Sequence, residues 1–365
     1  MIVARAAALS AADWDDLTAR ALVPALGAGR AWAGQLLPEL GALSIVTAAD
    51  GNLTGVFALT RSGWRRGRLW PVWRSARSPL IFSGLGLVDA HCATDVFTAL
   101  INQSDAAAIR LDGIPADGPF WHSLAAAAAN AGTEPVILKR WQRAALRTGQ
   151  TFEGWFEANF ERKRRKEYRR LRARLGEAGA LVTESWQPGA PLDPWIDALL
   201  ALEAKGWKGR RGTAVAADAA AATALRAALG DLSQTAGLRF WRLLLDGQPL
   251  AMMFAMVEGG QAWLGKIAYD EAFAKFSPGV LLILDATAAT LADPAIAFAD
   301  SCAIPGHPMI DHIWRDRLAL CSVLIPAPGQ PLWKRRALVA TERCHDGVRD
   351  LARNLLNRLR KRLHP

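Results

Sequence analysis

Two distant stretches of the chain share one pattern. Residues 43–61 and 238–259 each read as a β-rich run, an Asp-Gly pair and a second β-rich run. Glycine accepts the positive φ that a two-residue turn requires, so each stretch predicts a β-hairpin. The expected turn residues are Asp50 with Gly51, and Asp246 with Gly247. Any α+β protein contains hairpins, so the hairpins alone do not establish a repeat.

The elements expected after each hairpin follow a matching order. After the first hairpin we expect two strands, a helix, a strand, a helix and a strand, at 67–73, 78–84, 92–104, 106–113, 119–131 and 134–142. After the second we expect a strand, a helix and two strands, at 261–270, from Gly279, at 295–303 and at 317–326. The agreement favours a duplicated unit. The predicted fold class is α+β, with mixed sheets flanked by helices.

The junction between the two units is expected within residues 146–155, where a strand ends and Thr151 can cap a new helix. This predicts an N-terminal unit of residues 1–148, a C-terminal unit of residues 149–330 and a tail of residues 331–365.

The tail carries apolar residues at helical spacing among Arg and Lys. They are Cys344, Val348, Leu351, Leu355, Leu359 and Leu363. The pattern predicts a basic amphipathic helix. Its apolar side either docks on the protein's own core or makes peripheral contact with an anionic membrane.

The net charge of +10 is concentrated in two segments. Residues 161–174 carry nine basic and two acidic side chains, and residues 334–362 carry ten basic and three acidic, so the remainder is slightly acidic. The sequence also lacks an RNP, KH or zinc-finger pattern. Both observations argue against a protein that recognises nucleic acid over a whole face.

The basic segment 161–174 follows a helical apolar stripe that Arg164 interrupts. The stripe consists of Phe156, Phe160, Tyr168, Leu171 and Leu175. We interpret the segment as one amphipathic helix with its apolar side on the C-terminal unit. Its cations form either a solvated face or the wall of a groove for an anionic acceptor.

Cysteine usage and hydropathy bear on the cellular compartment. Cys92, Cys302, Cys321 and Cys344 form no CxxC pair and do not cluster with histidines, so we expect neither a zinc site nor disulfides. Residues 1–17 lack the apolar core of a signal peptide, and Asp285, Asp293 and Pro294 interrupt the most apolar run. We expect a cytoplasmic protein or one held peripherally at the inner face of the membrane.

The segment 262–291 has the form of an anion site. A strand ends near Tyr269, a short loop follows, and Pro278 and Gly279 open a helix. The free N–H groups of a first helical turn, with the helix dipole behind them, suit a phosphate. An ordinary helix N-terminus has the same pattern, so the order of the neighbouring elements must decide.

Four segments carry a family resemblance. They are "NFERKRRKEYRRLRARL", "LEAKGWKGRRGTAV", "IAYDEAFAKFSPGVLL" and "FADSCAIPGHPMIDHIWRDR", within residues 150–325. The C-terminal half resembles GNAT-like acyltransferases of the CelD/BcsL type, which are associated with cellulose and exopolysaccharide synthesis and related to FemAB aminoacyltransferases. The N-terminal half resembles the degenerate first unit of tandem GNAT proteins, mainly in layout.

The resemblance implies acyl transfer from acetyl-CoA or acyl-CoA, used as a cosubstrate, with no permanently bound cofactor and no metal. The pyrophosphate is expected on the backbone N–H groups of Ser277, Gly279, Val280 and Leu281, and the acyl carbonyl on the strand edge at Ala268 and Tyr269. The usual cradle reads Arg/Gln-x-x-Gly-x-Gly/Ala. Here Lys275 begins "KFSPGV", which leaves an aminoacyl-tRNA donor open.

The expected chemistry is positioning plus proton transfer. Asp300, at the end of the strand "AIAFAD", is the first candidate base, and capping of the following turn is the alternative role. His307 and His312 are alternative bases, and Tyr269 is the candidate acid.

The acceptor is expected to be an anionic, sugar-containing small molecule or a lipid-linked precursor. The candidate residues that bind it are Trp207, Lys208 and Arg210 of "KGWKGRRGTAV", with Arg165 and Arg169 of the basic segment. A basic surface loop is the alternative for the first three.

The leading functional hypothesis is an acyltransferase, most simply an N-acetyltransferase, that acts on a polysaccharide or cell-envelope precursor. The alternatives are a FemAB-type aminoacyl-tRNA-dependent transferase, a non-enzymatic basic protein that binds nucleic acid, and an inactive GNAT scaffold. The basic segment has no sustained heptads, which favours the CoA donor over the tRNA donor.

Overall fold

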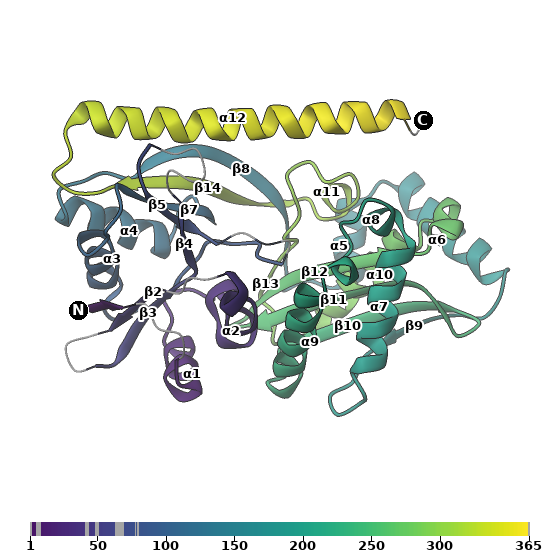
Figure 1. Ribbon diagram of the computed structural model, residues 1–365. Coiled ribbons are helices and arrows are strands. Elements are labelled where there is room, and N and C mark those ends of the chain that lie inside the picture. The colour runs from purple at the N-terminus through teal and green to yellow at the C-terminus, as the bar shows by residue number, and fades with distance from the viewer. Residues whose placement is uncertain are drawn as a thin grey trace.

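The computed structural model describes residues 2–4, 9–40, 44–47, 51–62, 69–76, 78 and 80–363. The strands in these residues form two sheets (Figure 1). The smaller sheet has the order β1 (Ile2–Ala4), β2 (Ser44–Thr47), β3 (Leu53–Phe57), β6 (Leu87–Val88). The larger, ten-stranded sheet has the order β4 (Leu59–Ser62), β5 (Val72–Ser75), β7 (Ala108–Pro115), β14 (Asp316–Pro326), β8 (Val136–Arg147), β13 (Phe298–Asp300), β12 (Gln261–Tyr269), β11 (Gln248–Glu258), β10 (Leu238–Leu245), β9 (Leu181–Ser185).

Helices flank these sheets, and α12 lies across the outer side of the molecule beside β8 and β14 (Figure 1). The α-helices are α1 (Ala11–Ala19), α2 (Arg30–Leu40), α3 (Ala93–Asn102), α4 (Pro119–Asn130), α5 (Phe152–Asn159), α6 (Arg162–Gly176), α7 (Asp193–Lys205), α8 (Trp207–Arg210), α9 (Ala219–Gln234), α10 (Pro278–Ala292), α11 (Ile310–Ile313) and α12 (Leu332–Leu363). Short 3-10 turns lie at η1 (Leu26–Ala28), η3 (Val215–Ala217) and η4 (Glu271–Phe276).

Both predicted hairpins are present. β2 pairs antiparallel with β3, with Thr47 opposite Leu53; Asp50 of the predicted turn lies outside the described residues. β10 pairs antiparallel with β11, and Asp246 and Gly247 join them with φ values of 49° and 77°. These left-handed values are the backbone geometry that the Asp-Gly pair predicts.

The duplicated order is also present, with an exchange that the sequence does not reveal. β5, α3, β7, α4 and β8 correspond in order to β12, α10, β13, α11 and β14. β5 is parallel to β7, and β12 is parallel to β13. The last strand of each unit, however, pairs with the other unit: β14 with β7, and β8 with β13. Each unit therefore completes the sheet of the other.

The exchange joins the two units that we predicted to divide at residue 148 and to end at residue 330. These boundaries stay a prediction. Cys321, Val323 and Ile325 of β14 are buried in the core of the N-terminal unit. In the other direction, Trp32 of α2 belongs to the core beneath α7 and α9, and its indole N–H donates to Leu80 O at 3.0 Å. The two units share one ten-stranded sheet.

Two local predictions were wrong. Residues 80–86 form an irregular loop where we expected a strand over 78–84; the Ser83 hydroxyl anchors the loop by donating to Gly113 O at 3.2 Å. The apolar stripe from Phe156 to Leu175 does not lie on one helix, because Phe160 is extended (ψ 136°) and separates α5 from α6; the segment 161–174 itself does form the single helix predicted for it, α6. Thr151 caps α5 as predicted, through a bond from Gly154 N at 3.2 Å.

Two cores fix the site-bearing half of the sheet. On one face, α5, α6 and α10 contribute Phe156, Tyr168 and Leu281 to a core with Met253. On the other face, α7 and α9 pack against Phe240 and Phe254. Neighbouring residues of β11 therefore point to opposite faces, as strand geometry requires, and both faces are buried.

Candidate active site

The site lies where two parallel strands separate. β12 and β13 pair only over Gln261–Trp263, opposite Phe298–Asp300. β13 then ends, while β12 continues to Tyr269 and leads through η4 into α10. The separation opens the sheet next to the start of α10, where helix dipole and free N–H groups favour negative charge.

Three residues, Asp270, Ser277 and Pro278, shape the turn that leads into α10. The Asp270 carboxylate accepts from Ala272 N at 3.0 Å and begins η4. Ser277 is left-handed (φ 53°, ψ 51°), and Pro278 occupies the first helical turn, where its missing N–H costs nothing. The helix predicted to start near Gly279 is confirmed.

The predicted phosphate cradle needs correction. Three of its four N–H groups already have backbone acceptors: Ser277 N donates to Ala274 O at 2.9 Å, and Val280 N and Leu281 N donate to Ser277 O at 2.9 and 3.1 Å. The Ser277 carbonyl accepts the first helical bonds, as the residue before a helix normally does, and the Ser277 N–H closes the last turn of η4. Within the described residues, Gly279 N–H is the one member of the four with no acceptor assigned.

A cavity of about 220 Å³ lies at this point. It is lined by Arg164, Tyr168, Tyr269, Ala274, Ser277, Gly279, Val280, Pro308, Met309, His312 and Ile313. It thus brings together four residues predicted for the site, Tyr269, Ser277, Gly279 and Val280, with the alternative base His312. Leu281, also predicted, is buried in the core instead (1% exposed).

Gly279 permits the close packing of the cavity wall. A Cβ at this position would lie 3.2 Å from Cδ1 of Tyr269 and 3.6 Å from Sδ of Met309. Glycine therefore lets the Tyr269 ring lie over the start of α10.

Arg164 brings a positive charge to the cavity. Its Nε donates to the Tyr168 hydroxyl at 3.1 Å, and its guanidinium carbon lies 5.1 Å from the centre of the Tyr168 ring. Tyr168 is itself buried and packs edge-on against Phe160, with ring centres 5.3 Å apart. Our prediction missed Arg164 as a site residue, although its interruption of the apolar stripe was the available signal.

The predicted acceptor loop lies beside this cavity, with Tyr269 shared between them. Trp207, Lys208 and Ala268 line a smaller hollow of about 30 Å³. Lys208 Nζ donates to Glu203 Oε1 at 2.9 Å and to Ile267 O at 3.2 Å, so it ties the loop to β12.

Glu203 is buried and accepts the ion pairs that connect the loop to β12. It is 3% exposed, and Lys266 Nζ lies 3.6 Å from its Oε1. Burial acts to raise the pKa of Glu203, but Lys208 and Lys266 outweigh it, so the pKa lies below its usual value. Burial lowers the pKa of Lys266, although Glu203 opposes this effect.

Arg210 also makes an ion pair within the protein. Its Nη2 donates to Glu271 Oε2 at 2.5 Å, and Trp207 N donates to Glu271 Oε1 at 2.6 Å. The Trp207 side chain is 42% exposed and stacks under the guanidinium of Arg211 at 4.8 Å. Arg210 is exposed as well, but its guanidinium is paired with Glu271, so Trp207 offers an exposed ring with no ion pair to break.

Two predicted bases lie elsewhere. Asp300 is 1% exposed, forms an ion pair with Arg143 and accepts from Cys302 N at 2.9 Å. His307 Nδ1 faces Met309 N at 3.3 Å, and burial lowers the pKa of this histidine. Neither residue lines the cavity, and both stabilise turns, which is the alternative role raised for Asp300.

The remaining predicted residues surround the site without lining the cavity. Arg165 Nη1 donates to Glu157 O at 3.0 Å and to Phe160 O at 2.9 Å, which holds the junction of α5 and α6. Arg169 is exposed. Lys275 Nζ lies 4.9 Å from the centre of the Phe276 ring. Among the described side chains, no group of three or more potential ligands could hold a metal ion.

Comparison with known proteins identifies the part of the chain that contains this site. Residues 162–300 match the model of the acetyltransferase (GNAT) domain. This region is a GNAT acyltransferase domain. It contains α6, β12, the start of α10 and β13, while Met309 and His312 of the cavity follow it in the chain.

Solved structures resemble the whole chain in fold. FemX is 11% identical, with 92% of this chain and 99% of that chain covered and a TM-score of 0.57. A conserved protein of unknown function from Bacteroides thetaiotaomicron is 12% identical (89% and 100% covered, TM-score 0.55). The C-terminal DUF2156 domain of a protein described as a lysylphosphatidylglycerol synthetase from Agrobacterium fabrum is 13% identical (87% and 91% covered, TM-score 0.51).

No curated protein matches the chain. At identities this low, the structural likenesses show the fold alone. The matched domain therefore indicates GNAT-type acyl transfer for residues 162–300, and the solved structures show that an α+β fold of this kind extends over most of the chain.

Proposed function

We propose that the GNAT domain transfers an acyl group, most simply acetyl, from acyl-CoA to an amine or hydroxyl of an anionic, sugar-containing precursor of a cell-envelope polysaccharide. The observation that carries the proposal is the cavity of about 220 Å³ at the start of α10. It combines a helix N-terminus with the guanidinium of Arg164, and both favour the phosphates of a CoA donor.

The cavity also supplies groups for proton transfer. In the reaction, the acceptor nitrogen or oxygen bonds to the thioester carbonyl carbon, and the carbon–sulfur bond then breaks. His312 is placed to take the acceptor's proton, and the Tyr269 hydroxyl to give a proton to the leaving thiolate, because both line the cavity. His312 thus takes the role of base in place of Asp300 and His307, and Tyr269 keeps the role of acid expected for it.

The acceptor is proposed to enter between α6 and α8. The exposed cations of α6 attract an anionic precursor, and the partly exposed Trp207 ring offers a flat surface for a sugar. Lys208 and Arg210 act indirectly, since their ion pairs with Glu203 and Glu271 hold this loop in place.

An aminoacyl-tRNA donor is the second candidate. Two observations favour it: the likeness in fold to FemX, and the basic helix α6 beside the cavity. Both donors carry phosphate as well as an acyl carbonyl, so Arg164 can serve either. The donors differ in what they bind outside the cavity, and a binding experiment therefore separates them.

The experiment is a calorimetric titration with acetyl-CoA of the wild type, Arg164→Ala and Arg169→Ala. Arg169 is the matched control, because it lies on the same helix, is exposed and does not line the cavity. We expect saturable binding that weakens about tenfold in Arg164→Ala, the loss typical of a charge-assisted contact, and is unchanged in Arg169→Ala. Absence of wild-type binding at millimolar acetyl-CoA would exclude the CoA donor and favour aminoacyl-tRNA.

A further inference from the structure

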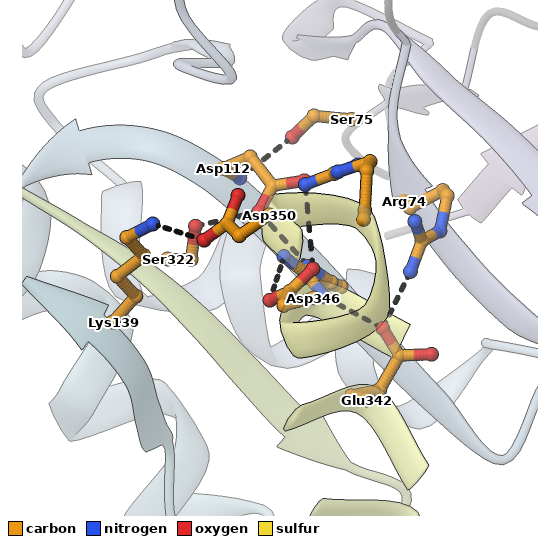
Figure 2. A network of polar contacts seen from close by, with 10 residues as sticks. Arg74, Ser75, Asp112, Lys139, Ser322, Glu342, Asp346 and Asp350 are labelled. Atoms are coloured by element: carbon orange, nitrogen blue, oxygen red, sulfur yellow. Dashed lines mark hydrogen bonds and ion pairs between the residues drawn. The ribbon is translucent and has the colours of Figure 1, made fainter. Parts of the chain in front are cut away.

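Helix α12 packs on the molecule through an acidic face. Its three acidic residues, Glu342, Asp346 and Asp350, recur every four residues and so lie along one side of the helix. Figure 2 shows Glu342 turned towards Arg74 and Asp350 turned towards Lys139. The distances are 2.5 Å from Arg74 Nη2 to Glu342 Oε2 and 2.9 Å from Lys139 Nζ to Asp350 Oδ2.

A buried arginine fixes this orientation. Arg110 of β7 is 1% exposed; it donates to Glu342 at 2.7 Å and to Asp346 at 2.8 Å. Glu342 is also 1% exposed. Rotating α12 about its axis would leave these charges buried without partners, which is strongly unfavourable. The ion pairs therefore determine which face of α12 points outwards.

The face that points outwards is apolar. Trp333, Val348, Leu351 and Leu355 are 65%, 61%, 70% and 60% exposed, and Cys344 is also exposed. At 3.6 residues per turn, these five positions fall within an arc of about 60°. An amphipathic helix of a globular protein normally buries such a stripe. Here the three acids are turned inwards beside the buried Leu338, while the longer apolar stripe is exposed.

The distribution of charge on α12 indicates what kind of partner its exposed face would contact. All three acidic residues of α12 lie on the inner face, whereas its sequence holds ten Lys and Arg residues. Arg336 and Arg343 are exposed and flank the apolar stripe; the Arg343 Nη2 also reaches the backbone of β8, at 3.4 Å from Ile137 O. The exposed part of the helix therefore combines large apolar side chains with positive charge beside them, and its sequence places no acid there.

We infer that the outer face of α12 lies on an anionic lipid bilayer, parallel to its plane. Apolar side chains enter the boundary between headgroups and acyl chains while Arg and Lys contact the headgroups, and both interactions act together. A second copy of the chain would oppose cations with cations. No helix in the described residues is long and apolar enough to cross a membrane. The inference is independent of the acyl donor and of the acceptor.

The test is co-sedimentation of the full chain with sucrose-loaded vesicles of phosphatidylcholine alone or of phosphatidylcholine with phosphatidylglycerol. The variants are Leu351→Glu on the outer face of α12 and Val182→Glu on β9. Val182 is the matched control, an exposed apolar residue (49%) on another element. Circular dichroism of both variants verifies that they are folded.

We expect the wild type and Val182→Glu to sediment with the anionic vesicles only, and less so as salt is raised. The partition coefficient of Leu351→Glu should fall about tenfold or more, through lost apolar insertion and an added negative charge. Equal sedimentation of Leu351→Glu and wild type, or no binding of the wild type to anionic vesicles, would overturn the inference. Light scattering that shows a wild-type dimer dissociated by Leu351→Glu, without vesicle binding, would replace the bilayer with a second copy.

Discussion

The two units place different chemistry at the same point of a shared topology. In the C-terminal unit, the gap beyond the parallel strands β12 and β13 holds a cavity lined by Arg164, whose Nε donates to the neutral Tyr168 hydroxyl. In the N-terminal unit, the corresponding gap beside β5 and β7 holds a cavity of about 260 Å³. The larger volume does not make it the better site, because its charged side chains pair with one another.

The side chains in the N-terminal gap explain the difference. Arg110 donates to Asp112 at 2.9 Å and also binds two acids of α12. Lys139, on the wall of the same cavity, pairs with Asp350. The charges that could receive a ligand are thus used to hold α12. The same topology therefore supports stability in the N-terminal unit and a candidate active site in the C-terminal unit. The side chains that line each gap determine which of the two it does.

The largest expected effect concerns this structural use of charge. Glu342→Ala would leave Arg74 and Arg110 buried without their shared carboxylate. We expect the free energy of unfolding to fall by about 3–5 kcal/mol, the usual cost of breaking a buried ion pair, measured by urea denaturation. The control is Glu177→Ala on an exposed carboxylate. Equal stability of the two variants would show that the network does not hold α12.

The next prediction concerns one histidine on each of the helices α4 and α11, which occupy corresponding places in the two units. His312 of α11 lines the cavity, whereas His122 of α4 is exposed beside Asp117. His312→Ala should lower kcat about a hundredfold with little change in KM, as for loss of a general base, and His122→Ala should change neither. Steady-state rates with an amine acceptor decide, and an unchanged kcat in His312→Ala would remove it from proton transfer.

A smaller effect is expected where the two units meet. Glu258, at the end of β11, lies against Gly29, whose Cβ would be 3.0 Å from Glu258 Oε2. Burial raises the pKa of Glu258 to about 7; the Ala25 N–H opposes this effect and Asp15 adds to it. Because the folded state holds the proton more tightly than the unfolded state, the contribution of Glu258 to stability is largest below about pH 4.5 and is lost as pH rises through 7.

Glu258→Gln removes this loss by keeping a neutral side chain. At pH 8 we expect the variant to be more stable than the wild type, with a free energy of unfolding higher by about 2 kcal/mol. At pH 4 this difference should vanish. Denaturation at the two pH values measures it. A difference that does not depend on pH would contradict the assigned protonation.

Local signals in the sequence predicted much of the fold. The Asp-Gly pairs gave both hairpins, Thr151 gave the start of α5, and Pro278 with Gly279 gave the start of α10, because each acts on its own few residues. The exchange of β8 and β14 was not predictable in this way. Both are apolar strands after a helix, and which neighbour each one pairs with depends on contacts distant in the chain.

The site was predicted in part for the same reason. Tyr269, Gly279 and Val280 lie near one turn, so sequence order is enough to bring them together, and all three line the cavity; their roles stay predictions. Asp300 was assigned as a base because its partner Arg143 is 157 residues away, beyond the reach of a sequence pattern. The acidic stripe of α12 was a readable signal at four-residue spacing, and its significance depends on the buried Arg110.

The claim that the C-terminal gap is the site is tested most directly by one calorimetric comparison. Acetyl-CoA is titrated into Gly279→Val and Lys139→Ala, which alter the walls of the C-terminal and N-terminal cavities. A side chain at Gly279 meets the Tyr269 ring and fills the space at the start of α10, so binding should weaken more than about tenfold. Lys139→Ala should bind as the wild type does. Loss of binding in Lys139→Ala with wild-type affinity in Gly279→Val would contradict the account.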